Sequence, residues 1–109
     1  MRGVLITFEG VEGSGKSTQA GRLAKRLAAL GVPCLVSREP GGTKIGEAVR
    51  SILLNPQHNE MHGLTELFLY LASRNQHVRE KVMPALAMMV PAMEPPPAPL
   101  IVAALPTCE

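Results

Sequence analysis

Apolar residues along the chain follow two patterns, short continuous runs and helical spacing. Residues 4–8, with the sequence VLITF, form a run enriched in β-branched side chains, which is typical of a buried strand. Apolar residues then recur at helical spacing from residue 20 to residue 30, and Gly31 follows as a typical helix terminator. A second apolar run at residues 33–37 predicts a second buried strand.

Two more helices are expected after a loop at residues 38–43. This loop follows the carboxyl end of a strand, which is where open α/β sheets bind their ligands. A polar connector at residues 57–63 separates the helices. Their spacing predicts that they bury Ile45, Val49, Ile52 and Leu53 in one helix and Leu64, Leu67, Phe68, Leu71 and Ala72 in the other. Strands and helices therefore alternate, as in an α/β fold.

The segment GVEGSGKST lies between the first strand and the first helix and fits the phosphate-binding pattern G-x-x-x-x-G-K-[ST]. The alternative, a glycine-rich turn before a helix, does not explain the order strand, loop, helix that the motif requires. Lys16 would reach the β- and γ-phosphates of a nucleotide, and the Ser17 hydroxyl would ligate Mg²⁺. The predicted ATP-binding residues are Gly10, Val11, Glu12, Gly13, Ser14, Gly15, Lys16, Ser17 and Thr18.

Glu12 is unexpected in such a loop. A carboxylate about 4 Å from a phosphate costs on the order of 4 kcal/mol at an effective dielectric constant of 20. A second ligand that hydrogen-bonds this carboxylate would offset the repulsion.

A polar stripe runs along the third predicted helix, with Glu66, Tyr70, Arg74 and His77 at intervals of four, four and three residues. An ordinary solvated face would look the same. A tyrosine four residues before an arginine is also suited to a planar base, because the ring stacks and the guanidinium donates to a base carbonyl. We assign no role to His77, since the sequence pairs it with no nucleophile.

Composition limits the remaining functions. With 109 residues the chain is one domain at most, and its 11 Lys and Arg residues are scattered at a net charge of +2, which predicts no nucleic-acid partner. Cys34 and Cys108 lack metal or redox spacing, and the sequence shows neither a signal peptide nor a membrane span. We expect a cytoplasmic protein with free thiols. His58 and His62 lie in a predicted loop and receive no role.

Three segments, residues 8–19, 38–43 and 70–77, closely resemble bacterial thymidylate kinases in order and separation. The resemblance covers residues 3–87 and implies transfer of the γ-phosphoryl group of ATP to thymidine monophosphate (dTMP) with Mg²⁺. It also implies the doubly wound parallel sheet of P-loop nucleoside-monophosphate kinases, with flanking helices, and a possible homodimer. A nucleotide-binding module without catalysis, or a P-loop transferase for another small acceptor, are the alternatives.

The resemblance also suggests individual roles. Glu12 would accept a hydrogen bond from the 3′-hydroxyl of the acceptor, which would explain its presence, and with Lys16 it forms the predicted catalytic pair. Tyr70 would stack on thymine and Arg74 would hydrogen-bond the base edge. The acceptor pocket would be shaped by Arg38, Glu39 and Pro40. Some relatives carry a catalytic arginine at the position of Gly13, and others take it from a lid further along the chain.

The resemblance stops near residue 87. Residues 88–109 hold six of the ten prolines, three of the six methionines and no Lys or Arg. We therefore expect residues 1–87 to be the N-terminal part of a kinase domain and residues 88–109 to be an atypical tail. A shifted reading frame or a naturally divergent terminus would explain it, and the encoding DNA distinguishes them. These 109 residues, which lack the lid, are expected to have little or no activity.

The expected sheet is incomplete for the same reason. In the strand order that the resemblance implies, the third strand lies between the first and the second. The apolar run at residues 100–105 is the one segment of the tail that could occupy this position.

Overall fold

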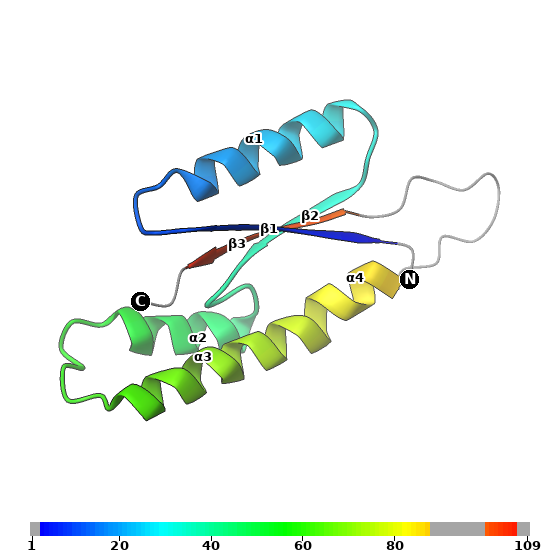
Figure 1. The fold of residues 1–109 in the computed structure, drawn as a ribbon. Coiled ribbons are helices and arrows are strands. Elements are labelled where there is room, and N and C mark those ends of the chain that lie inside the picture. Colours follow the sequence, from blue (N-terminus) through cyan, green and yellow to red (C-terminus); the bar gives the residue numbers. More distant parts are fainter. Residues whose placement is uncertain (1–2, 88–99, 107–109) are drawn as a thin grey trace.

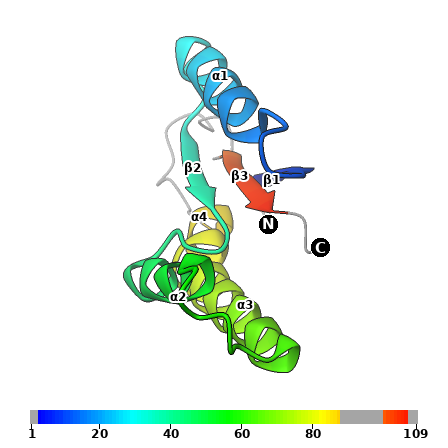
Figure 2. The ribbon, with the colours of Figure 1, turned by 90° about the vertical axis from the view of Figure 1, so that its left-hand side faces the viewer.

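A parallel sheet with helices on both faces forms the frame of the molecule. The computed structural model describes residues 3–87 and 100–106. Helix α1 covers one face of the sheet, and α2, α3 and α4 lie on the other (Figures 1 and 2). The elements in chain order are β1 (Val4–Gly10), α1 (Lys16–Ala29), β2 (Cys34–Arg38), α2 (Lys44–Leu54), α3 (Gly63–His77), the π-helical η1 (Val78–Val82), α4 (Met83–Ala87) and β3 (Leu100–Pro106).

Strand β3 is the centre of the sheet, in the order β1-β3-β2. It pairs in parallel with both neighbours, so that Leu100 is opposite Val4 on one side and Cys34 on the other. A central strand satisfies backbone groups of both flanking strands that would otherwise have no partner in the sheet. The prediction that residues 100–105 fill the position between the first two strands is confirmed. The domain boundary near residue 87 stays a prediction, and residues 88–99 and 107–109 of the tail lie outside the described residues.

Helix α1 packs on the sheet as its apolar spacing predicts. Ala20 is buried, and the half-buried side chains around it come from β1, α1, the turn after α1 and the start of β2: Ile6, Phe8, Leu23, Leu27, Val32 and Cys34. The small side chain of Ala20 permits close approach of the helix to the strands. The helix ends where Leu30 and Gly31 donate hydrogen bonds back to its last carbonyls.

The inner face predicted for α3 is wrong, and that predicted for α2 is wrong in part, since Val49 and Leu53 are half-buried there. Leu64 is 62% exposed and Phe68 60% exposed, and Leu67 and Leu71 are also exposed. Helix α3 instead buries Ser73 and His77, and α2 buries Gly46, because both helices turn their polar or small residues toward the loop at residues 38–43. On α2, Ile45 and Ile52 are exposed for the same reason.

The prediction that the first two strands are buried is also wrong for several of their side chains. Val36 of β2 is 51% exposed, and Val4 and Leu5 of β1 are also exposed. Both strands are edges of the sheet among the described residues, so that each has a strand on one side only. A continuous apolar run is therefore no proof of a central strand.

Helices α3, η1 and α4 form one continuous rod (Figure 1). Within it, the N–H of Met83 donates to the carbonyl of Val78, five residues back, as in a π-helix. Pro84 follows at once and has no N–H for a regular helical bond, which favours a distortion here. The wider turn keeps His77 and Val82, five residues apart, on the buried side of the rod.

Candidate active site

The loop after β1, residues 11–15, continues directly into the first turn of α1. Gly15, the residue before the helix, has a φ of 88°, a conformation that glycine adopts without strain. The first helical bond in α1 is donated by the N–H of Gln19 to the carbonyl of Gly15. The N–H groups of the preceding residues are therefore not used by the helix, and a helix N-terminus of this kind attracts anions.

Lys16 lies across this loop. Its Nζ donates to the carbonyl oxygen of Gly10 at 2.7 Å, and its side chain is half-buried. An ammonium group has three donors, so this bond leaves two of them for other acceptors. Ser17 and Thr18 follow in the first helical turn and are exposed.

The loop at residues 38–43 is held by hydrogen bonds from two helices. The peptide bond between Glu39 and Pro40 is cis. The N–H of Gly41 donates to the hydroxyl of Ser73 on α3 at 3.0 Å, and the Pro40 carbonyl accepts from Arg50 on α2 at 2.9 Å. These contacts hold both polar groups of the peptide unit between Pro40 and Gly41.

Glu39 is the buried acid of this loop. Its Oε2 accepts from Nε of Arg74 at 2.7 Å, and its Oε1 accepts from Nδ1 of His77 at 2.9 Å. Burial raises the pKa of the Glu39 carboxyl, but hydrogen bonds and charge from His77 and Arg74 outweigh it, so that its pKa is lowered overall. Glu39 is therefore an ionised carboxylate at neutral pH.

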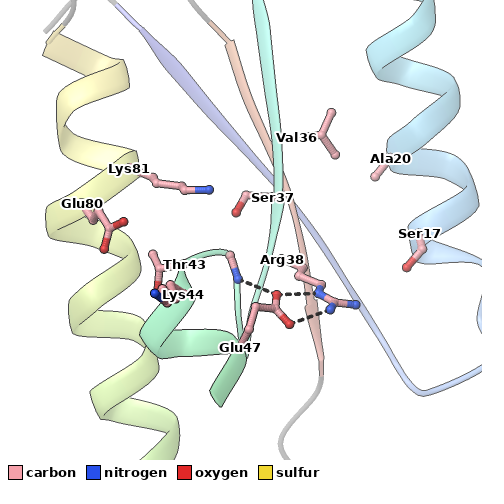
Figure 3. Close-up of a pocket in the computed structure, with 11 residues that line it drawn as sticks. Ser17, Ala20, Val36, Ser37, Arg38, Thr43, Lys44, Glu47, Glu80 and Lys81 are labelled. Carbon is pink, nitrogen blue, oxygen red and sulfur yellow. Dashed lines mark hydrogen bonds and ion pairs between the residues drawn. The ribbon is translucent and has the colours of Figure 1, made fainter. Parts of the chain in front are cut away.

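Arg38 is held by a second carboxylate. Its Nε and Nη2 donate to the two oxygens of Glu47 at 3.1 and 2.7 Å, and the N–H of Gly42 also donates to Glu47 (Figure 3). The bonds from Arg38 and from Gly42 lower the pKa of Glu47 to about 2. The hydrogen bond to Glu47 and the charge of its carboxylate raise the pKa of Arg38, although burial opposes this. This planar fork orients Arg38 at the carboxyl end of β2.

A cavity of about 580 Å³ joins the two loops. The predicted site residues on its wall are Glu12, Gly13, Gly15, Lys16, Ser17, Thr18, Arg38, Glu39, Pro40 and Tyr70. Gly10, Val11 and Ser14 belong to the first loop but do not line the cavity. Arg74 does not line the cavity, but its Nε donates a hydrogen bond to Glu39, which does.

A second cavity of about 560 Å³ lies beside β2, between α1 and the helices of the opposite face. Its lining includes Ser17, Ser37, Glu47 and Lys81 (Figure 3). Ser17 and Arg38 line both cavities, so that the two spaces meet near the carboxyl end of β2.

Sequence reasoning missed several residues that hold or line the site. His77 received no role, yet it is buried and hydrogen-bonded to Glu39, while Ser37, Glu47 and Ser73 also hold the loop or its neighbours. Arg50 and Glu66 line the cavity. The helical spacing of Glu66, Tyr70 and His77 was the available signal, because these residues recur on the inner side of α3.

Comparisons with known proteins identify the family of this chain. The family model described as thymidylate kinase matches residues 8–90. The chain belongs to the thymidylate kinase family. Two curated thymidylate kinases, from Exiguobacterium sibiricum and Pelotomaculum thermopropionicum, are 54% and 50% identical to it over 87 and 86 residues. Those matches cover 80% and 79% of this chain and 41% and 40% of the relatives, so the chain spans about two fifths of their length.

A solved structure supports the same assignment. The crystal structure of thymidylate kinase from Ehrlichia chaffeensis superposes with a TM-score of 0.74 at 31% sequence identity, covering 94% of this chain and 53% of that chain. The predicted family and the P-loop kinase type of α/β fold are thus confirmed for this thymidylate kinase family member.

The Arg38–Glu47 pair predicts how stability depends on pH. The folded pKa of Glu47, about 2, is below its ordinary value of 4.5, so the pair stabilises the fold above pH 4.5 and loses this effect as pH falls toward 2. Glu47→Gln should therefore lower the free energy of unfolding at pH 7. Between pH 5 and pH 3, the free energy of unfolding should fall less steeply in this variant than in the unaltered chain. Urea unfolding at several pH values measures this. Glu60→Gln, in the exposed turn before α3, is the control, and equal pH slopes for Glu47→Gln and the unaltered chain would contradict the account.

Proposed function

We propose that the protein containing this chain transfers the γ-phosphoryl group of ATP to dTMP. The observation that carries the proposal is the shared cavity, in which Glu12 and Lys16 of the phosphate loop face the same space as Arg38, Glu39 and Tyr70. Phosphoryl transfer depends mainly on positioning and charge stabilisation, so both substrates must be held in one cavity.

On the donor side, Lys16 and the backbone N–H groups at the start of α1 bind the ATP phosphates. The bond from Lys16 to the Gly10 carbonyl keeps the ammonium group over the loop, where two of its donors remain for phosphate. A positive charge at this position stabilises the negative charge that spreads over the transferred group. The surrounding residues 10–18 form the rest of the donor site.

Mg²⁺ fits this site through Ser17. The hydroxyl of Ser17 is exposed at the first turn of α1, on the wall of the cavity beside Lys16. The described residues contain no cluster of three or more His, Cys, Asp or Glu side chains that could enclose an ion. Mg²⁺ commonly binds through few protein ligands, together with substrate phosphates and water. An ion held there by Ser17 would neutralise phosphate charge.

On the acceptor side, Tyr70 stacks on thymine and Arg74 donates to the base edge. Tyr70 lines the cavity from α3, and Arg74 follows one helical turn later with its Nε held by Glu39. Arg38, fixed by Glu47, and Pro40 shape the opposite wall. Glu12, on the phosphate loop, accepts a hydrogen bond from the 3′-hydroxyl of the acceptor, which relieves the repulsion that its charge would otherwise cause.

We also propose that the protein forms a homodimer through α3. Leu64, Leu67, Phe68 and Leu71 form an exposed apolar stripe at helical spacing. A second copy of the same stripe would cover it around a two-fold axis.

We further propose that the protein resides in the cytoplasm. Among the described residues no helix is both long and apolar enough to cross a bilayer. The free thiol of Cys34 agrees with a reducing compartment.

Ligand-dependent thermal stability of the chain tests the donor and acceptor assignments. A ligand at 100 times its dissociation constant adds about 2.7 kcal/mol of stability. Lys16→Ala should reduce the shift produced by ATP and magnesium, because a charge aimed at the phosphates is lost. Glu12→Gln, which keeps shape and removes charge, should reduce the shift produced by dTMP more than that produced by ATP.

Lys25→Ala, an exposed lysine of the same helix, is the control for Lys16. An unchanged ATP shift in Lys16→Ala would remove the donor assignment. A dTMP shift no larger than that of other nucleoside monophosphates would remove the acceptor assignment.

The dimer is tested by Phe68→Glu, which places a charge in the middle of the apolar stripe. We expect sedimentation to show a dimer for the unaltered chain and a monomer for the variant, because an unpaired charge in an apolar interface is costly. Asn59→Glu, at an exposed position in the turn before α3, should leave the dimer intact. A monomeric unaltered chain at high concentration would refute the dimer.

A further inference from the structure

A chain of three hydrogen bonds runs from the sheet to the candidate acceptor site. The Ser37 hydroxyl is 2.6 Å from Nε2 of His77, Nδ1 of His77 is 2.9 Å from Glu39 Oε1, and Nε of Arg74 is 2.7 Å from Glu39 Oε2. Exposure increases along it, from 1% for His77 through 9% for Glu39 to 56% for the Arg74 side chain. The chain therefore connects a buried imidazole to a guanidinium at the surface.

The direction of these bonds follows from the chemistry of the groups. An ionised carboxylate only accepts hydrogen bonds, so Nδ1 of His77 carries a proton and donates to Glu39. In the neutral ring, Nε2 then accepts from the Ser37 hydroxyl. With a partner at each nitrogen, the imidazole has one orientation, and so has the carboxylate that it contacts.

The backbone at Gly42 closes over this chain. Gly42 has a φ of 80°, and a Cβ atom placed on it would lie 2.5 Å from Oγ of Ser37 and 2.8 Å from Cδ2 of His77. No larger residue fits there without moving one of these groups. The close approach of Gly42, which lies just before α2, therefore holds the hydrogen bond between Ser37 and His77 in place.

Arg74 depends on this arrangement because its side chain is more than half exposed. Its Nε–H is used by Glu39, while a guanidinium has four more donors on its two terminal nitrogens. A long exposed side chain samples many rotamers unless one of its groups is fixed. The fixed group here is Nε, and the carboxylate that fixes it is itself oriented by His77.

We propose that His77 is a positioning residue for recognition of the acceptor base. It orients the Glu39 carboxylate, which in turn directs the terminal donors of Arg74 toward the carbonyl edge of the base. This inference rests on the proposed function, since it assumes that Arg74 contacts the acceptor base. It assigns a role in selectivity to His77, a buried residue that does not line the cavity.

Two substitutions at His77 separate positioning from simple packing. The amide nitrogen of asparagine occupies roughly the place of Nδ1, so His77→Asn keeps the donor to Glu39. The amide nitrogen of glutamine corresponds to Nε2, so His77→Gln keeps a partner for Ser37 and loses the donor to Glu39. We expect His77→Gln to bind dTMP about tenfold more weakly, with its ATP affinity unchanged, and His77→Asn to recover most of the loss.

Calorimetric titration of each variant with dTMP, deoxycytidine monophosphate and ATP measures these effects. The preference for thymine over cytosine should fall in His77→Gln, because cytosine carries an amino group where thymine carries a carbonyl. Equal losses of dTMP and ATP affinity, or equal dTMP affinities for the two variants, would overturn the proposal and leave His77 a packing residue.

A ligand-free measurement keeps the test independent of the proposed function. In the ¹⁵N-labelled chain, the Nε–H resonance of Arg74 should be protected from exchange with water, lose this protection in His77→Gln and retain it in His77→Asn. An Nε–H signal unaffected by His77→Gln refutes positioning. If the unaltered chain shows no dTMP binding while the resonance behaves as expected, the proposed function fails and the positioning of Arg74 stands.

Discussion

The buried carboxylate of Glu39 is the interaction on which the candidate site depends. It connects the loop after β2 to two residues of α3 that are 35 and 38 positions away in the sequence. An unpaired charge at this depth would be strongly destabilising, so Glu39 requires both His77 and Arg74 as partners. The requirement fixes where α3 lies relative to the sheet, and thus where Tyr70 faces the cavity.

The sheet supplies the other half of this arrangement. Successive side chains of β2 point to opposite faces, so Leu35 and Ser37, two residues apart, share one face. Leu35 contacts the buried residues Val82 and Ala85, and Ser37 contacts His77. The π-helical turn keeps His77 and Val82 on one side of the rod. Packing and hydrogen bonding by this face of β2 therefore hold α3 beside the sheet, where its Tyr70 lines a cavity together with residues of the loop after β1.

Much of this was predictable from local patterns, and the failures have a common cause. The order of strand, loop and helix at the start of the chain and the position of residues 100–105 followed from motif, spacing and the vacant place in the sheet. Helical periodicity identified two faces on α3 but assigned burial to the apolar one, whereas Ser73 and His77 are buried. Their burial is favoured by contacts with the loop at residues 38–43, and spacing within one helix carries no information on such distant partners.

The central claim is that Glu39 and His77 stabilise the fold through their mutual contact, and a double-mutant cycle measures it most directly. Urea unfolding of the unaltered chain, Glu39→Gln, His77→Gln and the double variant gives the coupling free energy. We predict a favourable coupling of about 1–3 kcal/mol, as for residues in one hydrogen-bonded network. Additivity of the two single effects to within about 0.3 kcal/mol would contradict the account.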